Sequence, residues 1–307
     1  MSRVAIVIPT LGRPELLRRV LDRLDRQTAP PDAFELLVVA DAKEARPDVL
    51  EEAVAGRPYA GRVLRAERPG ASAARNTGWR GAGTPLVLFL DDDILPEPAL
   101  VAEHLDWHDR HPEEEVGVLG HVRWADELKV TPFMRWLEYG IQFDYPNIDG
   151  IEAGWGRFYT ANASVKRSLI ERVDGFEEER LPFGYEDLDV AKRMHEHGFR
   201  LLYNRAAVAE HVHPMDIEFW KRRASRIAIS ERQFAKMHPG FEPYFHALFS
   251  KAAAQPPARG RGARLARFVP RSFPFLGPRV WGSADTVFRQ TLAGPFLRAW
   301  EASADDG

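Results

Sequence analysis

The chain has 307 residues and a mass of 34.8 kDa, and 45% of its residues are hydrophobic and 28% charged, as is typical of a soluble globular protein. It contains no cysteine, which excludes disulfides, thiolate zinc sites, iron–sulfur clusters and cysteine nucleophiles, and its net charge of −3 gives no general attraction to nucleic acid. No apolar run approaches the roughly 18 residues that span a bilayer, and a strand pattern begins near the N-terminus without room for a secretion signal, so we expect a cytoplasmic protein.

The first 125 residues alternate short apolar runs with amphipathic segments. Apolar runs predict strands, and apolar residues at helical spacing predict helices between them. The predicted strands are 3–8, 34–39, 62–64 and 85–90, and the predicted helices are 14–24, 47–55, 71–80 and 97–110. Strands that alternate with helices indicate an α/β fold with a doubly wound, mostly parallel sheet.

The second half of the chain is less regular, and it ends in a basic segment. We expect a strand at 206–209 and a helix at about 216–237, whose arginines we interpret as a solvated face. From Lys251 to Arg298 there are nine Lys or Arg residues and one acidic residue, interleaved with aromatic residues. Prolines at 270, 274, 278 and 295 should interrupt any long amphipathic helix there. We therefore predict a C-terminal helical extension at 251–307.

Polar residues directly follow several predicted strands. Thr10 and Arg13 follow the first strand, Asp41 the second, and the acidic run 91–93 the fourth. Ligands of such sheets gather beyond the carboxyl ends of the strands, so these side chains should share one edge. Adjacent carboxylates with only oxygen ligands favour Mg²⁺ or Mn²⁺, which also accept phosphate oxygens. The alternative is a solvated acidic turn at the start of the next helix.

Several short motifs, which follow one another along the chain, resemble the signatures of family 2 glycosyltransferases. These enzymes have the GT-A fold, a Rossmann-like sheet with flanking helices. The similarity covers about residues 3–235. It rests on Val7-Ile8-Pro9-Thr10 with Arg13, Val38-Val39-Ala40-Asp41, Ala74-Arg75-Asn76-Thr77-Gly78, Asp91-Asp92-Asp93, Thr160-Ala161-Asn162-Ala163-Ser164, Val173-Asp174-Gly175-Phe176 and Gly184-Tyr185-Glu186-Asp187-Leu188-Asp189. On this resemblance, 1–125 is the donor-binding half of one domain and 126–250 its acceptor and catalytic half.

The resemblance implies roles on the donor side. Asp41 would contact the nucleotide base, although Ala40-Asp41-Ala42-Lys43 departs from the usual Asp-Asp-Gly-Ser and leaves the base open. Asp93 would bind the metal and Asp91 the ribose, while the side chain of Asp92 should point elsewhere. The implied nucleotide-sugar-binding residues are Pro9, Thr10, Arg13, Asp41, Arg75, Asp91 and Asp92.

It also implies roles on the acceptor side. Asp187 would be the catalytic carboxylate, with Glu186, Asn162 and Trp155 at the acceptor. His211 would be a second metal ligand, with His213 as its alternative. Structural interpretations compete with each of these: acids favoured at a helix N-terminus, an aromatic residue in the core, and a strand histidine without a ligand.

The predicted function is therefore a metal-dependent, inverting glycosyltransferase that uses Mn²⁺ or Mg²⁺. Its donor would be a nucleotide-diphosphate sugar, with UDP the commonest in the family and GDP and dTDP as alternatives. The acceptor would be a glycan, a lipid-linked molecule or a small molecule. The basic tail is consistent with peripheral contact with the inner face of a membrane rather than with nucleic acid, and the alternative is a set of helices packed on the catalytic domain with their arginines outward. Alternatives are a phosphatase or phosphotransferase of the haloacid dehalogenase type, a nucleotidyltransferase, and a non-catalytic nucleotide-sugar-binding module.

Overall fold

The computed structural model describes residues 2–181, 183–258 and 260–304. The chain divides into two compact units. The first, here called the α/β unit, consists of Met1–Leu128, Asn147–Glu178 and Glu186–His213. The second, here called the helical unit, consists of Lys129–Pro146, Glu179–Tyr185 and Pro214–Gly307.

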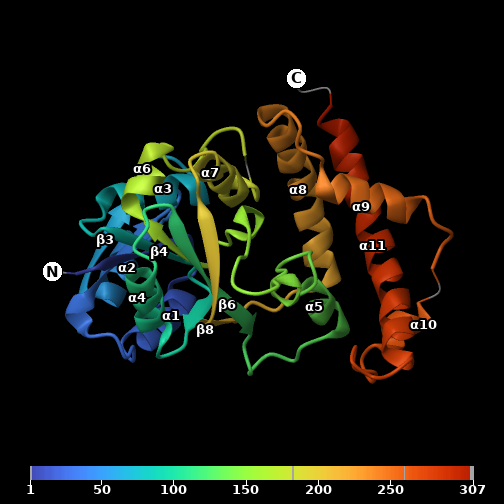
Figure 1. Ribbon diagram of the computed structural model, residues 1–307, viewed down its shortest axis with the longest axis horizontal. Coiled ribbons are helices and arrows are strands. Elements are labelled where there is room, and N and C mark those ends of the chain that lie inside the picture. The colour runs from blue at the N-terminus through green and yellow to red at the C-terminus, as the bar shows by residue number, and fades with distance from the viewer. Residues whose placement is uncertain (1, 182, 259, 305–307) are drawn as a thin grey trace. The chain divides into compact units, whose positions relative to one another are not determined.

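One mixed sheet of eight strands forms the centre of the α/β unit (Figure 1). Its order is β3-β2-β1-β4-β7-β6-β8-β5, and all strands run parallel except β7 and β5, which are antiparallel to their neighbours. The strands are β1 (Val4–Thr10), β2 (Phe34–Ala40), β3 (Ala60–Arg65), β4 (Leu86–Leu90), β5 (Ile94–Pro96), β6 (Val116–Trp124), β7 (Asn162–Lys166) and β8 (Arg200–His211). The strand order reverses between β1 and β4, where a ligand site is expected.

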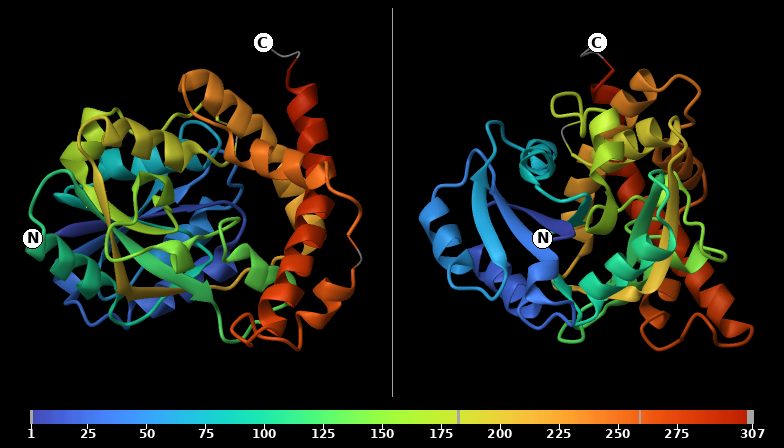
Figure 2. Two further views of the ribbon diagram at one scale, coloured as in Figure 1. Left: turned by 45° about the vertical axis from the view of Figure 1, so that its right-hand side comes forward. Right: turned by 60° about the vertical axis from the view of Figure 1, so that its left-hand side comes forward.

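Helices cover both faces of this sheet, with α1, α2 and α4 on one face and α3, α6 and α7 on the other (Figure 2). They are α1 (Pro14–Leu24), α2 (Pro47–Val54), α3 (Ala71–Gly81), α4 (Leu100–Arg110), α6 (Arg167–Arg172) and α7 (Glu186–His195), with 3₁₀ turns η1 (Pro31–Ala33) and η3 (Trp155–Arg157). The predicted mostly parallel α/β fold is confirmed.

Hydrophobicity explains which strands were predictable. Every residue of β4 is buried, and β1 and β2 each have one partly exposed residue, so all three read as nearly continuous apolar runs. β6 and β7 instead carry polar residues such as His121, Arg123 and Ser164, and the sequence analysis missed both. The helix predicted from residue 97 begins at Leu100, because the short strand β5 follows the acidic run.

Helix α3 lies unusually close to the sheet at Gly78. A Cβ atom at this position would lie 2.2 Å from Val7 Cγ1 and 3.2 Å from Val39 Cγ2. Such contacts are too short for any side chain, so glycine is required for the helix to pack this closely on β1 and β2.

The helical unit is built on a long C-terminal helix that packs against α8, α9 and α10 (Figure 1). Its core is aromatic, with Trp136 against Phe288 and Phe249 against Phe296. The helices are α5 (Pro132–Leu137), α8 (Ile217–Met237), α9 (Tyr244–Ala253), α10 (Arg261–Leu265) and α11 (Leu276–Ala302), and the 3₁₀ turn η2 (Tyr145–Asn147) adjoins the unit. No helix in the described part of the chain is long and apolar enough to cross a membrane.

One expectation about this unit is wrong. Prolines do not interrupt α11. Pro278 lies in its first turn, where a backbone N–H would have no helical partner, and Pro295 lies in a turn in which Leu292 and Phe296 are buried. The arginines of α8 were expected to form a solvated face, and Arg222 and Arg226 are exposed, while Arg223 is partly exposed. The guanidinium of Arg226 lies 3.8 Å from the centre of the Phe183 ring, and that of Arg223 lies 4.8 Å from it.

Candidate functional site

Three successive aspartates follow β4, and their side chains take different directions. Asp92 is fully buried, accepts a hydrogen bond from Thr10 Oγ1 at 2.7 Å, and pairs with Arg13. Asp93 retains 13% of its side-chain exposure and accepts a hydrogen bond from Arg13 Nη1 at 2.8 Å. Asp91 is the most exposed, at 31%. The ends of β1 and β4 are thus joined by Thr10 and Arg13, in what we call the β1–β4 edge.

Burial changes the proton affinity of this edge. It raises the pKa of Asp92 to about 7, and Asp91 and Asp93 push it further in the same direction. Arg13 and the Thr10 hydroxyl oppose the rise. Asp92 therefore changes its charge near neutral pH, which an exposed aspartate does not.

Asp41 directly follows β2 and orients the start of α3. Its Oδ2 accepts a hydrogen bond from Gly70 N at 2.6 Å, and its Oδ1 accepts one from Lys43 N at 2.8 Å. Gly70 has a φ of 113°, which favours glycine, and it is the N-cap of α3. Asp41 thus holds the helix that carries Arg75, while its predicted contact with a nucleotide base stays a prediction.

Arg75 joins the end of β4 to the first turn of α7. Its guanidinium donates to Asp91 Oδ1 at 3.0 Å and to Glu186 Oε1 at 3.1 Å, and the residue is 5% exposed. Among the described residues, neither Arg75 Nε nor Glu186 Oε2 has a hydrogen-bond partner, although both atoms are buried. Such atoms are rare in proteins and mark a place where a ligand can complete the bonding. Arg75, Asp91, Glu186 and Asp187 are called the Arg75 group below.

Asp187 is the second residue of α7 and belongs to the Arg75 group. Its Oδ1 accepts a hydrogen bond from Leu188 N at 2.9 Å. Burial raises the pKa of Asp187 to about 7, the neighbouring Glu186 carboxylate raises it further, and Arg75 opposes this. A carboxylate with a pKa near 7 can accept a proton at neutral pH more readily than an ordinary aspartate.

The sheet also brings His211 to the acidic run. His211 is the last residue of β8 and pairs with Ile94 of β5, and Val212 N donates to Asp93 O at 3.1 Å. Its ring is buried, contacts Trp124 edge-on, and accepts a hydrogen bond from His213 N at 3.2 Å. Within residues 2–181, 183–258 and 260–304, however, no three His, Asp or Glu side chains are arranged to hold a metal.

Trp155 and Asn162, two of the three residues expected at the acceptor, differ in exposure. Trp155 begins η3, is partly exposed, and stacks on His195 with ring centres 6.1 Å apart. Asn162 is fully buried, and its amide nitrogen donates to Ala207 O at 2.9 Å. The expectation that Asn162 faces an acceptor pocket is therefore wrong for this structure, because its side chain points into the layer between β7 and α4.

Asn162 is one end of a buried hydrogen-bonded chain. Lys166 Nζ lies 2.8 Å from His108 Nδ1, His108 Nε2 lies 2.8 Å from Ser164 Oγ, His104 Nδ1 lies 2.8 Å from the same hydroxyl, and His104 Nε2 lies 2.9 Å from Asn162 Oδ1. Because a lysine ammonium only donates and the Asn162 amide oxygen only accepts, every bond in the chain runs from Lys166 toward Asn162. Burial lowers the pKa of His104 to about 4 and also lowers that of His108, so both rings are neutral.

Sequence reasoning missed two acids that support the site. Glu44 accepts a hydrogen bond from Gly12 N at 2.6 Å and so holds the turn after β1, and this bond lowers the pKa of Glu44. Asp189 is buried and binds Arg193, which in turn donates to Gly175 O at 2.6 Å. Asp189 lies two residues after Asp187 in the quoted motif, which was a signal for it; nothing in the pattern identified Glu44.

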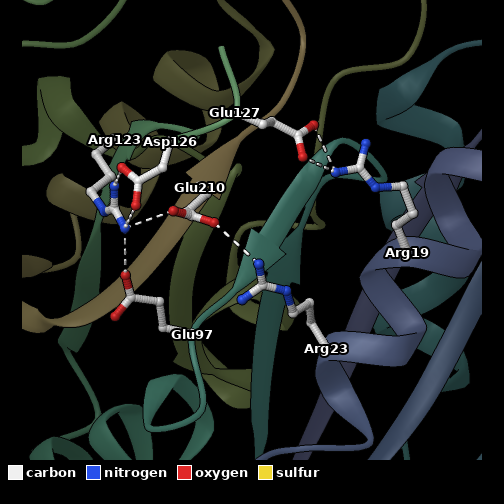
Figure 3. A network of polar contacts seen from close by, with 7 residues as sticks. All are labelled: Arg19, Arg23, Glu97, Arg123, Asp126, Glu127 and Glu210. Atoms are coloured by element: carbon white, nitrogen blue, oxygen red, sulfur yellow. Dashed lines mark hydrogen bonds and ion pairs between the residues drawn. The ribbon is translucent and has the colours of Figure 1, made fainter.

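A second polar assembly lies elsewhere in the α/β unit (Figure 3). Arg123 contacts Asp126 at 2.6 Å, Glu210 at 2.6 Å and Glu97 at 3.2 Å. Arg23 reaches Glu210 at 3.4 Å, and these residues line a cavity of about 300 Å³. We call Arg23, Glu97, Arg123, Asp126 and Glu210 the Arg123 network; Arg19 and Glu127 pair beside it at 2.8 Å.

Comparison with known proteins identifies relatives of the chain. The sequence model described as "Glycosyl transferase family 2" matches residues 5–210. Validoxylamine A glucosyltransferase from Streptomyces hygroscopicus subsp. limoneus is 27% identical over 281 residues, covering 78% of this chain and 58% of that protein. The uncharacterized glycosyltransferase YfnE from Bacillus subtilis is 24% identical over 254 residues, covering 68% of this chain and 64% of that protein. The chain thus spans about three fifths of the length of these relatives.

Solved structures share the fold. The mannosyltransferase PcManGT from Pyrobaculum calidifontis, in complex with GDP-Man and Mn²⁺, superposes with a TM-score of 0.65 at 21% identity, covering 99% of this chain and 87% of that one. TarS 1–349 from S. aureus, in complex with UDP-GlcNAc, superposes with a TM-score of 0.55 at 14% identity, covering 98% and 91%. At these identities the superpositions establish a common α/β architecture.

Proposed function

The chain belongs to glycosyl transferase family 2, and from this membership we propose that it transfers a sugar from a nucleotide-diphosphate sugar to an acceptor hydroxyl. The observation that carries the proposal is the Arg75 group. One buried arginine connects the acidic run after β4, the expected donor side, to the first turn of α7, the expected catalytic side. The haloacid dehalogenase alternative is not retained, because the family match spans residues 5–210.

On the donor side, we assign the diphosphate to the β1–β4 edge. Arg13 is 42% exposed, so its guanidinium can contact a phosphate while remaining paired with Asp93. The Nε of Arg75 has no hydrogen-bond partner among the described residues and is a second donor suited to a phosphate, a base or a sugar oxygen. Pro9, Thr10 and Asp41 shape the same strand ends, and Asp91, the most exposed acid, suits a ribose hydroxyl.

The acids of this edge fit a hard divalent cation. Asp91 and Asp93 both retain exposed surface, and Mg²⁺ and Mn²⁺ are commonly held by one or two carboxylates together with substrate phosphates. Because no three protein ligands are arranged for a metal in the described residues, we infer that nucleotide phosphates complete its binding. Asp93 would hold the ion, with His211 beside it, and a bound ion would stabilise the charge of the leaving diphosphate.

On the acceptor side, we assign Asp187 as the general base. The acceptor oxygen would attack the anomeric carbon as its proton passes to Asp187, and the bond to the diphosphate oxygen would break, so that the electron pair leaves with the nucleotide. A single displacement of this kind inverts the anomeric configuration. The pKa of about 7 matches this task near neutral pH. Glu186 and Trp155 are proposed to contact the acceptor, since Glu186 Oε2 has no hydrogen-bond partner within the described part of the chain.

A thermal-shift panel tests the donor assignment. The full chain is heated with UDP, GDP or dTDP, each with Mn²⁺, Mg²⁺ or EDTA. We expect one nucleotide to raise the melting temperature, the shift to disappear with EDTA, and the shift to be absent in Asp93→Ala, since binding only to the folded state stabilises it. Arg18→Ala, on a partly exposed arginine of α1 outside the site, is the matched control. A shift equal in EDTA or in Asp93→Ala would contradict the metal assignment.

A further inference from the structure

The segment that joins α10 to α11 exposes an unusual number of large apolar side chains. Exposure reaches 77% at Phe268, 52% at Phe273 and 88% at Phe275, with Leu265 at 49% and Leu276 at 47%. Single exposed apolar residues are ordinary, but five within 12 residues of sequence form a patch of the kind that binds a partner or a membrane. These five side chains, with Arg261, Arg264, Arg267 and Arg279, are called the Phe–Arg surface.

The backbone of this segment is well bonded, so the exposure does not result from frayed chain. Trp281 Nε1 donates to Val269 O at 2.8 Å, and Gly277 N donates to Phe273 O at 2.8 Å. A Cβ atom at Gly277 would lie 2.3 Å from Arg271 O, so the chain folds tightly on itself here. Phe275 has a φ of 58°, which is uncommon for a bulky residue, and it is the most exposed of the five. The turn presents the phenylalanines outward.

Positive charge surrounds the apolar side chains. Between Ala252 and Ala284 the sequence contains six arginines and no acidic residue. Arg261, Arg264, Arg267 and Arg279 are all exposed. This local excess contrasts with the net charge of −3 for the whole chain. The ligand of the surface should therefore be both anionic and able to take up apolar side chains.

We propose that the Phe–Arg surface adsorbs the chain to an anionic lipid membrane. Phenylalanine side chains insert at the boundary between headgroups and acyl chains, and arginines are attracted to the negative charge of anionic lipid headgroups. A protein partner would equally accept the phenylalanines, but it would need a matching acidic surface, whereas an anionic membrane supplies distributed negative charge. The contact is peripheral, and the inference does not depend on the proposed transferase activity.

Vesicle co-sedimentation of the full chain tests the proposal. The vesicles contain phosphatidylcholine alone, or phosphatidylcholine with phosphatidylglycerol, at low and high salt. We expect binding only to the phosphatidylglycerol vesicles, weakened by salt because exposed charges are screened. The triple variant Arg261→Gln/Arg264→Gln/Arg267→Gln should bind about two orders of magnitude more weakly.

The variants are matched to separate charge from apolar contact. Phe268→Ser/Phe273→Ser/Phe275→Ser keeps every arginine and should also lose binding. Arg18→Gln/Arg26→Gln/Arg110→Gln removes the same charge from exposed or partly exposed positions of the α/β unit and should bind as the parent chain does. Unchanged melting temperatures show that the variants fold.

Three outcomes would overturn the proposal: no binding to phosphatidylglycerol vesicles at low salt, equal binding to neutral vesicles, or equal loss in the control variant. A chain that dimerises in solution and becomes monomeric in the phenylalanine variant would also overturn it, since the surface would then be an interface between two copies. Light scattering coupled to size exclusion measures this.

Discussion

Two regions of the α/β unit contain arginine paired with carboxylate side chains, but the pKa values of their carboxylates are shifted in opposite directions. In the Arg123 network, hydrogen bonding to Arg123 lowers the pKa of Asp126, so Asp126 stays ionised at neutral pH (Figure 3). At the β1–β4 edge and in the Arg75 group, burial raises the pKa of Asp92 and of Asp187 to about 7. The same residue types therefore behave in opposite ways, because Asp126 is exposed to solvent, whereas Asp92 is fully buried and Asp187 is only partly exposed and lies beside the Glu186 carboxylate.

This difference separates a structural ion-pair network from a candidate catalytic centre. Both regions are rich in charge, so a count of charged residues does not distinguish them. A carboxylate whose pKa is raised toward neutral can take and release a proton in the working range of pH, whereas a paired surface acid cannot. The predictions below test this distinction, beginning with the largest expected effect.

Substitution of Asp187, the proposed general base, should have the largest effect on sugar transfer. In Asp187→Asn we expect sugar transfer to fall by about 10³-fold, because general base catalysis contributes roughly 10²- to 10⁴-fold. Nucleotide binding should be retained, because Asp187 is assigned to the acceptor side. Transfer rates with a panel of nucleotide sugars, together with the thermal shift given by the nucleotide, measure the two effects separately. Loss of both would show that Asp187 supports the donor site instead, and unchanged transfer would favour a non-catalytic role for it.

The pH dependence of stability should distinguish Asp92 from Asp126. Asp92 has a raised pKa in the folded state, so its contribution to stability is present at low pH and is lost as the pH rises through about 7. The free energy of unfolding of Asp92→Asn, relative to that of the parent chain, should therefore increase by about 2–3 kcal/mol between pH 5 and pH 8. Urea unfolding in EDTA at the two pH values measures it.

Asp126→Asn is the matched control for Asp92→Asn. Asp126 has a lowered pKa, so its contribution is present above its ordinary pKa and is lost only in acid. Between pH 5 and pH 8 we expect the effect of Asp126→Asn on the free energy of unfolding to stay constant. The comparison between the two regions fails if the two variants respond to pH in the same way.

The smallest effect should come from breaking the Arg123 network. Arg123 is 37% exposed, and exposed ion pairs contribute roughly 0–1 kcal/mol each. Arg123→Gln should lower the free energy of unfolding by about 1 kcal/mol and leave nucleotide binding and transfer unchanged. Urea unfolding and the transfer assay test this together, and a large loss of transfer would mean that the network takes part in the reaction.

Buried parallel strands were the most predictable part of the fold. β1, β2 and β4 are apolar on both faces, so their sequences need no knowledge of neighbours. β7 could not be found in this way, because its polar residues Asn162 and Ser164 are satisfied by histidines of α4 far away in sequence. The full length of α11 could not be predicted for a related reason. Packing along the helix compensates for the destabilising effect of Pro295, and no local rule predicts that packing.

The candidate site, like the fold, could be predicted only in part from the sequence. Residue types and their order indicated the acids of the β1–β4 edge and Asp187, because the ends of strands and of a helix place them. The orientation of Asn162 was wrong, since a motif does not tell which face of a strand a side chain occupies. Likewise, no pattern showed that Arg75 would join Asp91 to Glu186, because that contact links segments more than 90 residues apart.

The close packing of α3 on the sheet has a consequence for Arg75. Arg75 lies three residues before Gly78 on this helix, so the distance between helix and sheet sets how far its guanidinium extends toward Asp91 and Glu186. A methyl group added at Gly78 would increase the distance between α3 and the sheet, and it would move Arg75 away from both carboxylates. A mutational survey limited to polar side chains would therefore overlook a position with no functional group, on which the alignment of the whole centre depends.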